Sequence, residues 1–144
     1  MTPNLNHHEL TERIIGAAIE VHRHLGPGFL EAIYEEALSV ELKLCNLAFE
    51  RQKKVFIMFK GRSVGEHRLD LLVEGLVVVE IKAVREIDPV FFAVARSYLH
   101  ATGLTTALLF NFAAFPLSIK RVGVEPLRST PSSSALPETP PAHC

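Results

Sequence analysis

Three charged residues on two neighbouring segments are the side chains of this sequence best suited to chemistry. Asp70 lies in one segment, and Glu80 and Lys82 follow the apolar run of residues 76–79 in the next. Side chains alternate faces along a strand, so Glu80 and Lys82 are expected to share a face. An E-x-K pair alone is typical of a solvent-facing ion pair. Here the charges interrupt a strand that is apolar on both faces, and buried charges need partners. This context indicates a functional site.

The position of Asp70 depends on the turn between the two strands. A three-residue loop, Glu74-Gly75-Leu76, pairs Val73 with Val77 and sets Asp70 directly across from Glu80. Gly75 suits such a loop because glycine adopts the left-handed conformation at little cost. A two-residue loop would place the two carboxylates on opposite faces. The three-residue register is the one predicted here.

Two opposed carboxylates predict a metal-dependent reaction. Like charges directly across two strands repel unless something neutralises them, and a divalent cation does so. Oxygen ligands of this kind suit Mg²⁺ or Mn²⁺, which take one or two protein carboxylates and complete their coordination with water and phosphate. Lys82 can then orient or help deprotonate the attacking water, or stabilise charge on the phosphate. The chemistry indicated is hydrolysis of a phosphodiester.

Glu31 is a fourth candidate, on the helix expected over residues 29–47. At 100° per residue it aligns with Leu38 and Leu42, at the border of the buried face. A glutamate in the first helical turn is also favoured by the helix dipole, so a purely structural role stays open. The main apolar stripe expected to face the core consists of Leu30, Ile33, Ala37, Val40 and Leu44.

Periodicity and turn residues predict the elements that position these side chains. They are helices over residues 9–25 and 29–47, strands over 55–59, 67–73 and 77–84, a helix over 88–101 and strands over 105–112 and 117–124. Asp88 is expected to cap the third helix, with Pro89 in its first turn. We expect a flexible N-terminus over residues 1–8, one domain over 9–124 and a disordered Pro/Ser-rich tail over 125–144.

Composition excludes little. The chain has 144 residues, two cysteines and a formal net charge of -1, which neither requires nor excludes a nucleic-acid partner. The sequence has no C-x-x-C pair, no secretory signal pattern and no apolar run long enough to span a membrane. We therefore expect a reduced, cytoplasmic protein that does not enter membranes. A protein partner or a homodimer is left open.

Several ordered motifs resemble those of bacterial GxxExxY proteins, which are grouped with the PD-(D/E)XK nuclease superfamily. The motifs are Gly28-Phe29-Leu30-Glu31-Ala32-Ile33-Tyr34, Arg68-Leu69-Asp70, Val79-Glu80-Ile81-Lys82, Ser97-Tyr98-Leu99 and Leu109-Phe110-Asn111-Phe112. The resemblance spans about residues 10–122. It implies an α/β fold with a mixed central sheet flanked by helices.

The resemblance also implies a set of site residues. Glu31, Asp70, Glu80 and Lys82 would be catalytic, and Asp70 and Glu80 would hold Mg²⁺ (or Mn²⁺) with the backbone carbonyl of Ile81. The family pattern commonly has glutamine four residues before Tyr98, where this chain has Val94.

Substrate contacts are assigned to Arg68 and Tyr98, although Tyr98 is also a candidate for simple packing. Strand alternation predicts that Arg68 shares a face with Asp70 and that His67 faces away. A basic rim for a nucleic-acid backbone is a further candidate. Its residues are Lys53, Lys54, Lys60, Arg62, Arg68 and Arg85.

Two functions remain open from the sequence. The first is a magnesium-dependent nuclease that cuts DNA or RNA through a Glu/Asp/Glu-x-Lys site. The alternative is a nucleic-acid-binding or regulatory module that keeps the nuclease fold with weak or no catalysis. Val94, at the position where the family commonly has glutamine, is the feature that favours this alternative. A small-molecule enzyme has little support, because no glycine-rich phosphate loop or nucleophile motif occurs.

Overall fold

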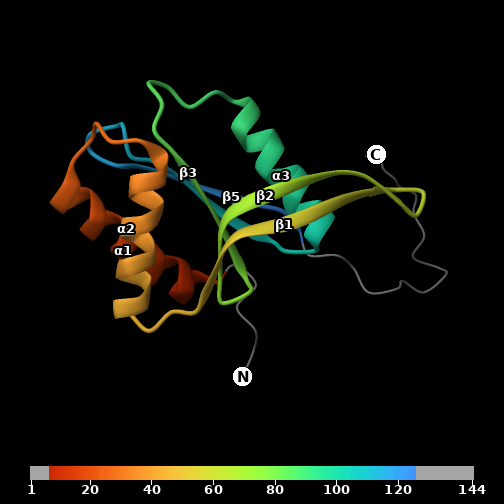
Figure 1. Ribbon diagram of the computed structural model, residues 1–144, viewed down its shortest axis with the longest axis horizontal. Coiled ribbons are helices and arrows are strands. Elements are labelled where there is room, and N and C mark those ends of the chain that lie inside the picture. Colours follow the sequence, from red (N-terminus) through yellow and green to blue (C-terminus); the bar gives the residue numbers. More distant parts are fainter. Residues whose placement is uncertain (1–6, 126–144) are drawn as a thin grey trace.

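The computed structural model describes residues 7–125 of the chain, as three helices and a five-stranded sheet (Figure 1). In chain order the elements are α1 (His8–Leu25), α2 (Glu31–Leu44), β1 (Phe49–Phe59), β2 (Arg62–Val73), β3 (Val77–Lys82), α3 (Val90–Thr102), β4 (Thr106–Asn111) and β5 (Ser118–Gly123). His8 opens α1, so the helix takes in one residue of the N-terminus expected to be flexible. Residues 1–6 and nearly all of the expected tail lie outside the described residues.

The sheet is mixed, as predicted, with β3 at its centre. Its strand order is β1-β2-β3-β4-β5, and only the β3–β4 pair is parallel. Val77, Val78 and Val79 are each at most 2% exposed, because both faces of β3 are covered. The α/β fold expected from the sequence is confirmed.

Two hydrophobic clusters lie on opposite faces of this sheet. One cluster joins α1 and α2 to side chains such as Leu71, Val79 and Phe110. The other joins α3 to Leu69, Leu72 and Val78. Helices therefore cover both faces, and the central strand carries its functional residues between the two layers.

The apolar stripe expected to hold α2 against the core was predicted wrongly. Leu30, Ile33, Val40 and Leu44 are exposed, and only Ala37 is half-buried. The helix instead buries Tyr34, Leu38 and Leu42 together with two polar residues, Glu35 and Ser39. Glu35 and Ser39 make hydrogen bonds in their buried positions, which is why polar side chains are tolerated there.

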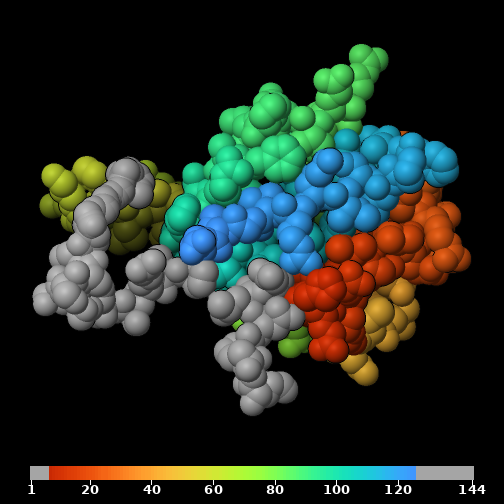
Figure 2. Space-filling model, turned by 180° about the vertical axis from the view of Figure 1, so that it is seen from behind, coloured from red at the N-terminus to blue at the C-terminus, as the bar shows by residue number. Residues whose placement is uncertain are grey.

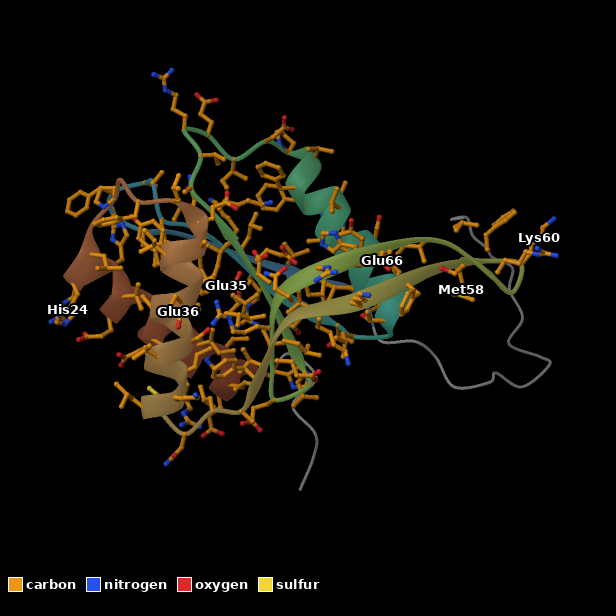
Figure 3. All side chains as sticks on the ribbon, viewed as in Figure 1. His24, Glu35, Glu36, Met58, Lys60 and Glu66 are labelled. Carbon is orange, nitrogen blue, oxygen red and sulfur yellow. The ribbon has the colours of Figure 1, made fainter. Side chains whose placement is uncertain are left out.

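β1 and β2 are much longer than the sequence indicated. They form a two-stranded ribbon that extends beyond the helices (Figure 1). Lys60 and Met58 lie near its tip (Figure 3). Both faces of the outer ribbon are exposed, so the apolar alternation that identifies a half-buried strand is missing from it. Within residues 7–125, no helix has the length and apolar character needed to cross a bilayer.

Candidate functional site

The hairpin between β2 and β3 has the predicted three-residue loop. Val73 pairs with Val77, and the loop residues Glu74 and Gly75 both have positive φ. The paired ladder runs from this pair to Leu71 and Val79 and ends there. Beyond it, Asp70 Oδ2 accepts a hydrogen bond from the N–H of Ile81 at 2.8 Å. Asp70 thus lies beside Glu80 where the two strands begin to separate.

Glu80 is the most perturbed acid of the site. The residue is 8% exposed, and its Oε2 atom is buried without a hydrogen-bond partner within the described part of the chain. Burial first, and then the neighbouring Asp70 carboxylate, raise the pKa of Glu80 to about 8, while Lys82 opposes the shift. At neutral pH the Glu80 carboxyl group therefore tends to stay protonated unless a cation binds to it.

Asp70 shows the same tendency more weakly. Burial raises its pKa, and the carboxylates of Glu35 and Glu31 add to the effect, whereas the Ile81 N–H and Lys82 lower it. The charges that act on Asp70 come from α2 on one side of the sheet and from β3 at its centre. Glu31, Asp70, Glu80 and Lys82, all predicted from sequence, therefore interact electrostatically in one region.

Lys82 and Tyr98 approach the site from the α3 face of the sheet. The Lys82 ammonium lies 4.4 Å from the centre of the Phe91 ring, on α3. Tyr98, also on α3, stacks on His67 with ring centres 3.8 Å apart and planes 10° apart. Burial first, and then Glu80, raise the pKa of Tyr98. Tyr98 therefore forms part of the wall around Glu80.

His67 is a site residue that the sequence reasoning missed. Its Nε2 atom lies 3.9 Å from Glu80 Oε2, and burial, followed by the charge of Lys82, lowers the pKa of the imidazole. It had been expected to face away from Asp70. Arg68, expected beside Asp70, is exposed, and its side chain makes no ion pair or hydrogen bond within residues 7–125.

An irregularity in the strands explains this error. Leu71 belongs to the α1–α2 cluster and Leu69 to the α3 cluster, although residues two apart on a regular strand share a face. The pairing of β1 with β2 passes from Arg51–Leu71 to Lys53–Leu69, and the intervening Gln52 has a φ of 52°. The alternation therefore changes at Asp70, and His67 turns toward α3 and Glu80.

Glu31 reaches the site through the backbone that follows Lys82. Its Oε2 atom accepts a hydrogen bond from the N–H of Ala83 at 3.2 Å. Asn111, buried at the end of β4, holds the next residue, Val84, by accepting from its N–H and donating to its carbonyl. These bonds secure the start of a segment between β3 and α3 that otherwise stands out from the surface (Figure 2, bright green).

Tyr34 positions the start of α2 and with it Glu31. The fully buried Tyr34 hydroxyl donates to the carbonyl of Gly26 at 2.5 Å and accepts from the N–H of Phe29 at 3.1 Å. The ring also stacks on Phe112, with centres 4.5 Å apart. The tyrosine of the G-x-x-E-x-x-Y motif therefore ties the preceding loop to the helix and the core.

Glu35 is a second residue that the sequence reasoning missed, because it was assigned to the solvent-facing side of α2. It lies on the side of the helix that faces the strands, whereas Glu36 lies further out (Figure 3). Glu35 accepts hydrogen bonds from Arg51 at 3.1 Å and from Gln52 at 2.9 Å. Its spacing of four residues from Glu31 was the available signal, since such residues share a helix face.

Asp70 and Glu80 are the side chains that could hold a divalent cation. Within residues 7–125 no group of three or more His, Cys, Asp or Glu side chains forms a ready metal cage. Asp70 and Glu80 nevertheless offer two neighbouring carboxylates, one of which has a buried oxygen without a partner. Mg²⁺ commonly takes only one or two protein carboxylates and keeps several waters. The donor set therefore fits this ion.

The basic residues expected to form a rim are spread over the ribbon and the loops. Lys53, Lys54, Lys60 and Arg62 are exposed on β1, its turn and the start of β2, and Arg85 is exposed after β3. Lys53 pairs with Glu50 at 3.2 Å. These positions leave the charges accessible to a polyanion without gathering them at Asp70.

Comparisons with known proteins agree with this architecture. The family model described as the PD-(D/E)XK nuclease superfamily matches residues 8–122. The fold is also similar to the crystal structure of SSO0001, with a TM-score of 0.51 and 20% sequence identity. That similarity covers 67% of this chain and 50% of the other protein, so this chain corresponds to half of that protein's length. A search of curated proteins found no match.

Proposed function

The chain belongs to the PD-(D/E)XK nuclease superfamily, and from this premise we propose that it hydrolyses phosphodiester bonds in DNA or RNA. Asp70, Glu80 and Lys82 are the residues assigned to the reaction, with Glu31 in support. Membership of a fold family does not decide activity, so the proposal depends on the chemistry of these side chains.

The observation that carries the proposal is the buried carboxyl group of Glu80. It lies beside a second carboxylate, has an oxygen without a hydrogen-bond partner in the described structure, and has a pKa raised to about 8 by burial and by Asp70. Such an arrangement is unfavourable for stability, since a buried acid without a counter-ion costs free energy. Strongly perturbed acids of this kind are typical of functional sites.

Asp70 and Glu80 would hold the cation, together with the backbone carbonyl of Ile81. When bound, Mg²⁺ or Mn²⁺ lowers the pKa of water and offsets negative charge on the phosphate. Asp70 is kept in place by the Ile81 N–H, which lets it act as a preorganised ligand. Two carboxylates close together lose their mutual repulsion in such a complex, because the cation neutralises both.

Lys82 would orient the attacking water and stabilise the charge that develops on the phosphate. Its ammonium already interacts with Asp70 and Glu80, and the Phe91 ring limits its movement. In the hydrolysis, the water oxygen forms a bond to phosphorus while the bond from phosphorus to the leaving oxygen breaks. Glu31 holds the backbone at Ala83, next to Lys82, so its first role would be to position that lysine.

Nucleic acid is the proposed substrate because exposed cations of the ribbon and the loops are accessible to a polyanion. Arg68 and the basic residues of the ribbon are available to phosphates, and Tyr98 offers a hydroxyl and a ring edge beside Glu80. Arg68 would contact a phosphate away from the metal, since it does not lie among the acidic side chains.

A catalytically weak binding or regulatory module is the second candidate function, and Val94 is the observation that favours it. Val94 is 38% exposed on α3, three residues after Phe91 and four before Tyr98. It therefore lies on the helix face whose neighbours contact Lys82 and His67. An apolar side chain there cannot make the hydrogen bonds that glutamine would offer a substrate or a water.

A cleavage assay tests the proposed nuclease. Purified protein is incubated with end-labelled single-stranded, duplex and branched DNA and RNA, with Mg²⁺, with Mn²⁺ or with EDTA. We expect cleavage that requires the metal and that Glu80→Gln and Lys82→Met each reduce by at least about a hundredfold. Lys120→Met, exposed on β5, is the matched control for loss of a cation and should cleave like wild type. Absence of cleavage of every substrate by the folded wild-type protein would favour the binding module.

A further inference from the structure

The outer face of α2 and the residue before it, Leu30, carry an apolar stripe of which only Ala37 packs against the core within residues 7–125. Leu30 is 77% exposed, Ile33 44%, Val40 52% and Leu44 74%, and Ala37 in the middle is half-buried. These five residues are called the α2 seam below. The four members within α2 lie on the side of the helix away from its buried residues Leu38 and Leu42, and Leu30 is the extended residue that precedes the first turn. Figure 1 shows α2 on the outside of the molecule, in front of α1.

The spacing of the α2 seam is that of a coiled-coil interface. Its members follow one another at intervals of three, four, three and four residues. This alternation is the a/d pattern of a heptad repeat, which places a narrow apolar stripe against a second helix. A helix that only covers its own domain needs no such stripe on its far side, and exposed apolar patches of this kind mark interaction sites.

We propose that the α2 seam joins two copies of this chain, with their α2 helices antiparallel around a twofold axis. In the register that interleaves the two seams, Ala37 lies opposite Val40 of the second copy and Ile33 lies opposite Leu44. The twofold axis repeats both pairings, so the seam is complementary to itself. The small Ala37 at the centre allows the helices to approach closely.

Charges beside the α2 seam select this orientation. Glu36 and Lys43 are exposed along one flank of the stripe, at equivalent heptad positions. In the antiparallel register, Glu36 of each copy lies opposite Lys43 of the other, which gives two reciprocal ion pairs. In a parallel pair, Glu36 would instead face Glu41 of the second copy, and like charges so placed repel. Antiparallel pairing of two identical helices therefore satisfies both the apolar and the charged positions.

The structure around the flank supports the pairing. Arg51 holds Glu36 by a hydrogen bond of 2.8 Å, which orients its carboxylate beside the seam. A groove between α2 and β1, lined by Val40, Lys43 and Phe49 among others, borders the same side and leaves room for the second helix. Because α2 is already folded against α1 and the sheet, pairing does not have to nucleate a helix.

A contact of two heptads is near the small end of specific interfaces, so the expected dimer dissociates in the micromolar range.

Reversing the charges that flank the α2 seam is the decisive experiment. Sedimentation velocity measures dimerisation of each variant from about 1 µM to about 1 mM protein. The wild-type chain is expected to pass from monomer to dimer over this range. Glu36→Lys and Lys43→Glu each place like charges at both flanking positions and should weaken dimerisation by about tenfold or more. An equimolar mixture of the two variants restores opposite charges at every pair and should form a heterodimer. Glu9→Lys on α1 is the matched control and should dimerise like wild type.

Dimerisation is also expected to depend on the apolar residues of the α2 seam. Val40→Asp should give a folded monomer, with folding checked by circular dichroism. A wild-type chain that remains monomeric at about 1 mM would overturn the proposal. A dimer that both charge variants leave unchanged would overturn it too, because it would have to use another surface. So would two weakened variants that fail to associate when mixed.

Discussion

The carboxylate of Asp70 accepts a hydrogen bond from the backbone N–H of Ile81, over 2.8 Å, at the point where the β2–β3 ladder has ended. A side chain thus takes the place of a strand-to-strand hydrogen bond. This contact holds Asp70 beside Glu80 and satisfies the N–H of a residue that is 1% exposed. Asp70 therefore has a structural role, as an acceptor for the Ile81 N–H, in addition to its proposed role as a metal ligand. Substitutions can separate these two roles.

Asp70→Ala and Asp70→Asn are expected to differ in stability. Alanine leaves the buried Ile81 N–H without an acceptor, which costs roughly 1–3 kcal/mol of unfolding free energy. Asparagine keeps an oxygen for this N–H and removes one of two repelling carboxylates, so its stability in EDTA should equal or exceed that of wild type. Urea denaturation measures both values. Equal stabilities of Asp70→Asn and Asp70→Ala would show that the hydrogen bond is unimportant, because both substitutions remove the charge and only asparagine keeps an acceptor.

The pH dependence of stability should report Glu80 when no metal is present. Its pKa is about 8 in the folded chain against 4.5 as a free side chain, so between these values the folded state binds more protons than the unfolded state. The free energy of unfolding therefore falls as pH rises, by roughly 1.5 kcal/mol between pH 6.5 and 8. His67, whose pKa is lowered from 6.5, has the opposite effect on the free energy of unfolding, and this effect fades above about pH 7, where the unfolded imidazole also loses its proton.

Glu80→Gln is the control for this pH profile. It removes the titrating group and should flatten the decline between pH 6.5 and 8, which thermal or urea unfolding in EDTA can follow. The variant should also be more stable than wild type at pH 8, since no buried charge develops in it. An unchanged slope in Glu80→Gln would assign the decline to other groups.

Tyr34→Phe should destabilise the chain and displace the start of α2. The substitution removes the hydroxyl that bridges Gly26 and Phe29, at a cost of about 1–2 kcal/mol. Tyr98→Phe is the matched control, because its hydroxyl makes no hydrogen bond within residues 7–125 and its ring stacking on His67 is retained. Chemical denaturation should therefore separate the two variants. If both lose the same free energy, the bridge at Tyr34 contributes nothing specific.

Local pattern was sufficient to predict much of the fold and the hairpin register. Gly75 and the apolar runs around it indicated the pairing of Val73 with Val77, because one register buries both strands. The side chains of Glu80 and Lys82 could be recognised because charge interrupts the central strand. These predictions needed only neighbouring residues, whose spacing is visible in the sequence.

Other features depended on distant parts of the chain. The left-handed conformation of Gln52 and the change of face at Asp70 arise where β1 pairs with β2, so neither the orientation of His67 nor that of Arg68 could be read from strand alternation. The buried side of α2 was also misassigned. Glu35 is buried because Arg51 and Gln52, on another element, hydrogen-bond to it. The regularly spaced apolar residues of the α2 seam were expected to face the core, but most of them lie on the exposed side of the helix.

Val94→Gln should increase the rate of cleavage or the affinity for nucleic acid. The position lies between Phe91 and Tyr98 on the face of α3 that borders Lys82 and His67, where an amide can hydrogen-bond to a substrate or a water. The expected gain is about tenfold. Ala93→Gln adds the same side chain on a different face of α3 and should have no effect. Equal responses of the two variants would mean that position 94 does not border the site.

Calorimetric titration of Mg²⁺ and Mn²⁺ into the folded chain tests the central claim most directly, because it asks whether Asp70 and Glu80 hold a cation regardless of the substrate. We predict saturable binding that Asp70→Asn and Glu80→Gln abolish and that Lys82→Met retains. Absence of binding at millimolar metal, or binding that Asp70→Asn and Glu80→Gln leave unchanged, would contradict the claim.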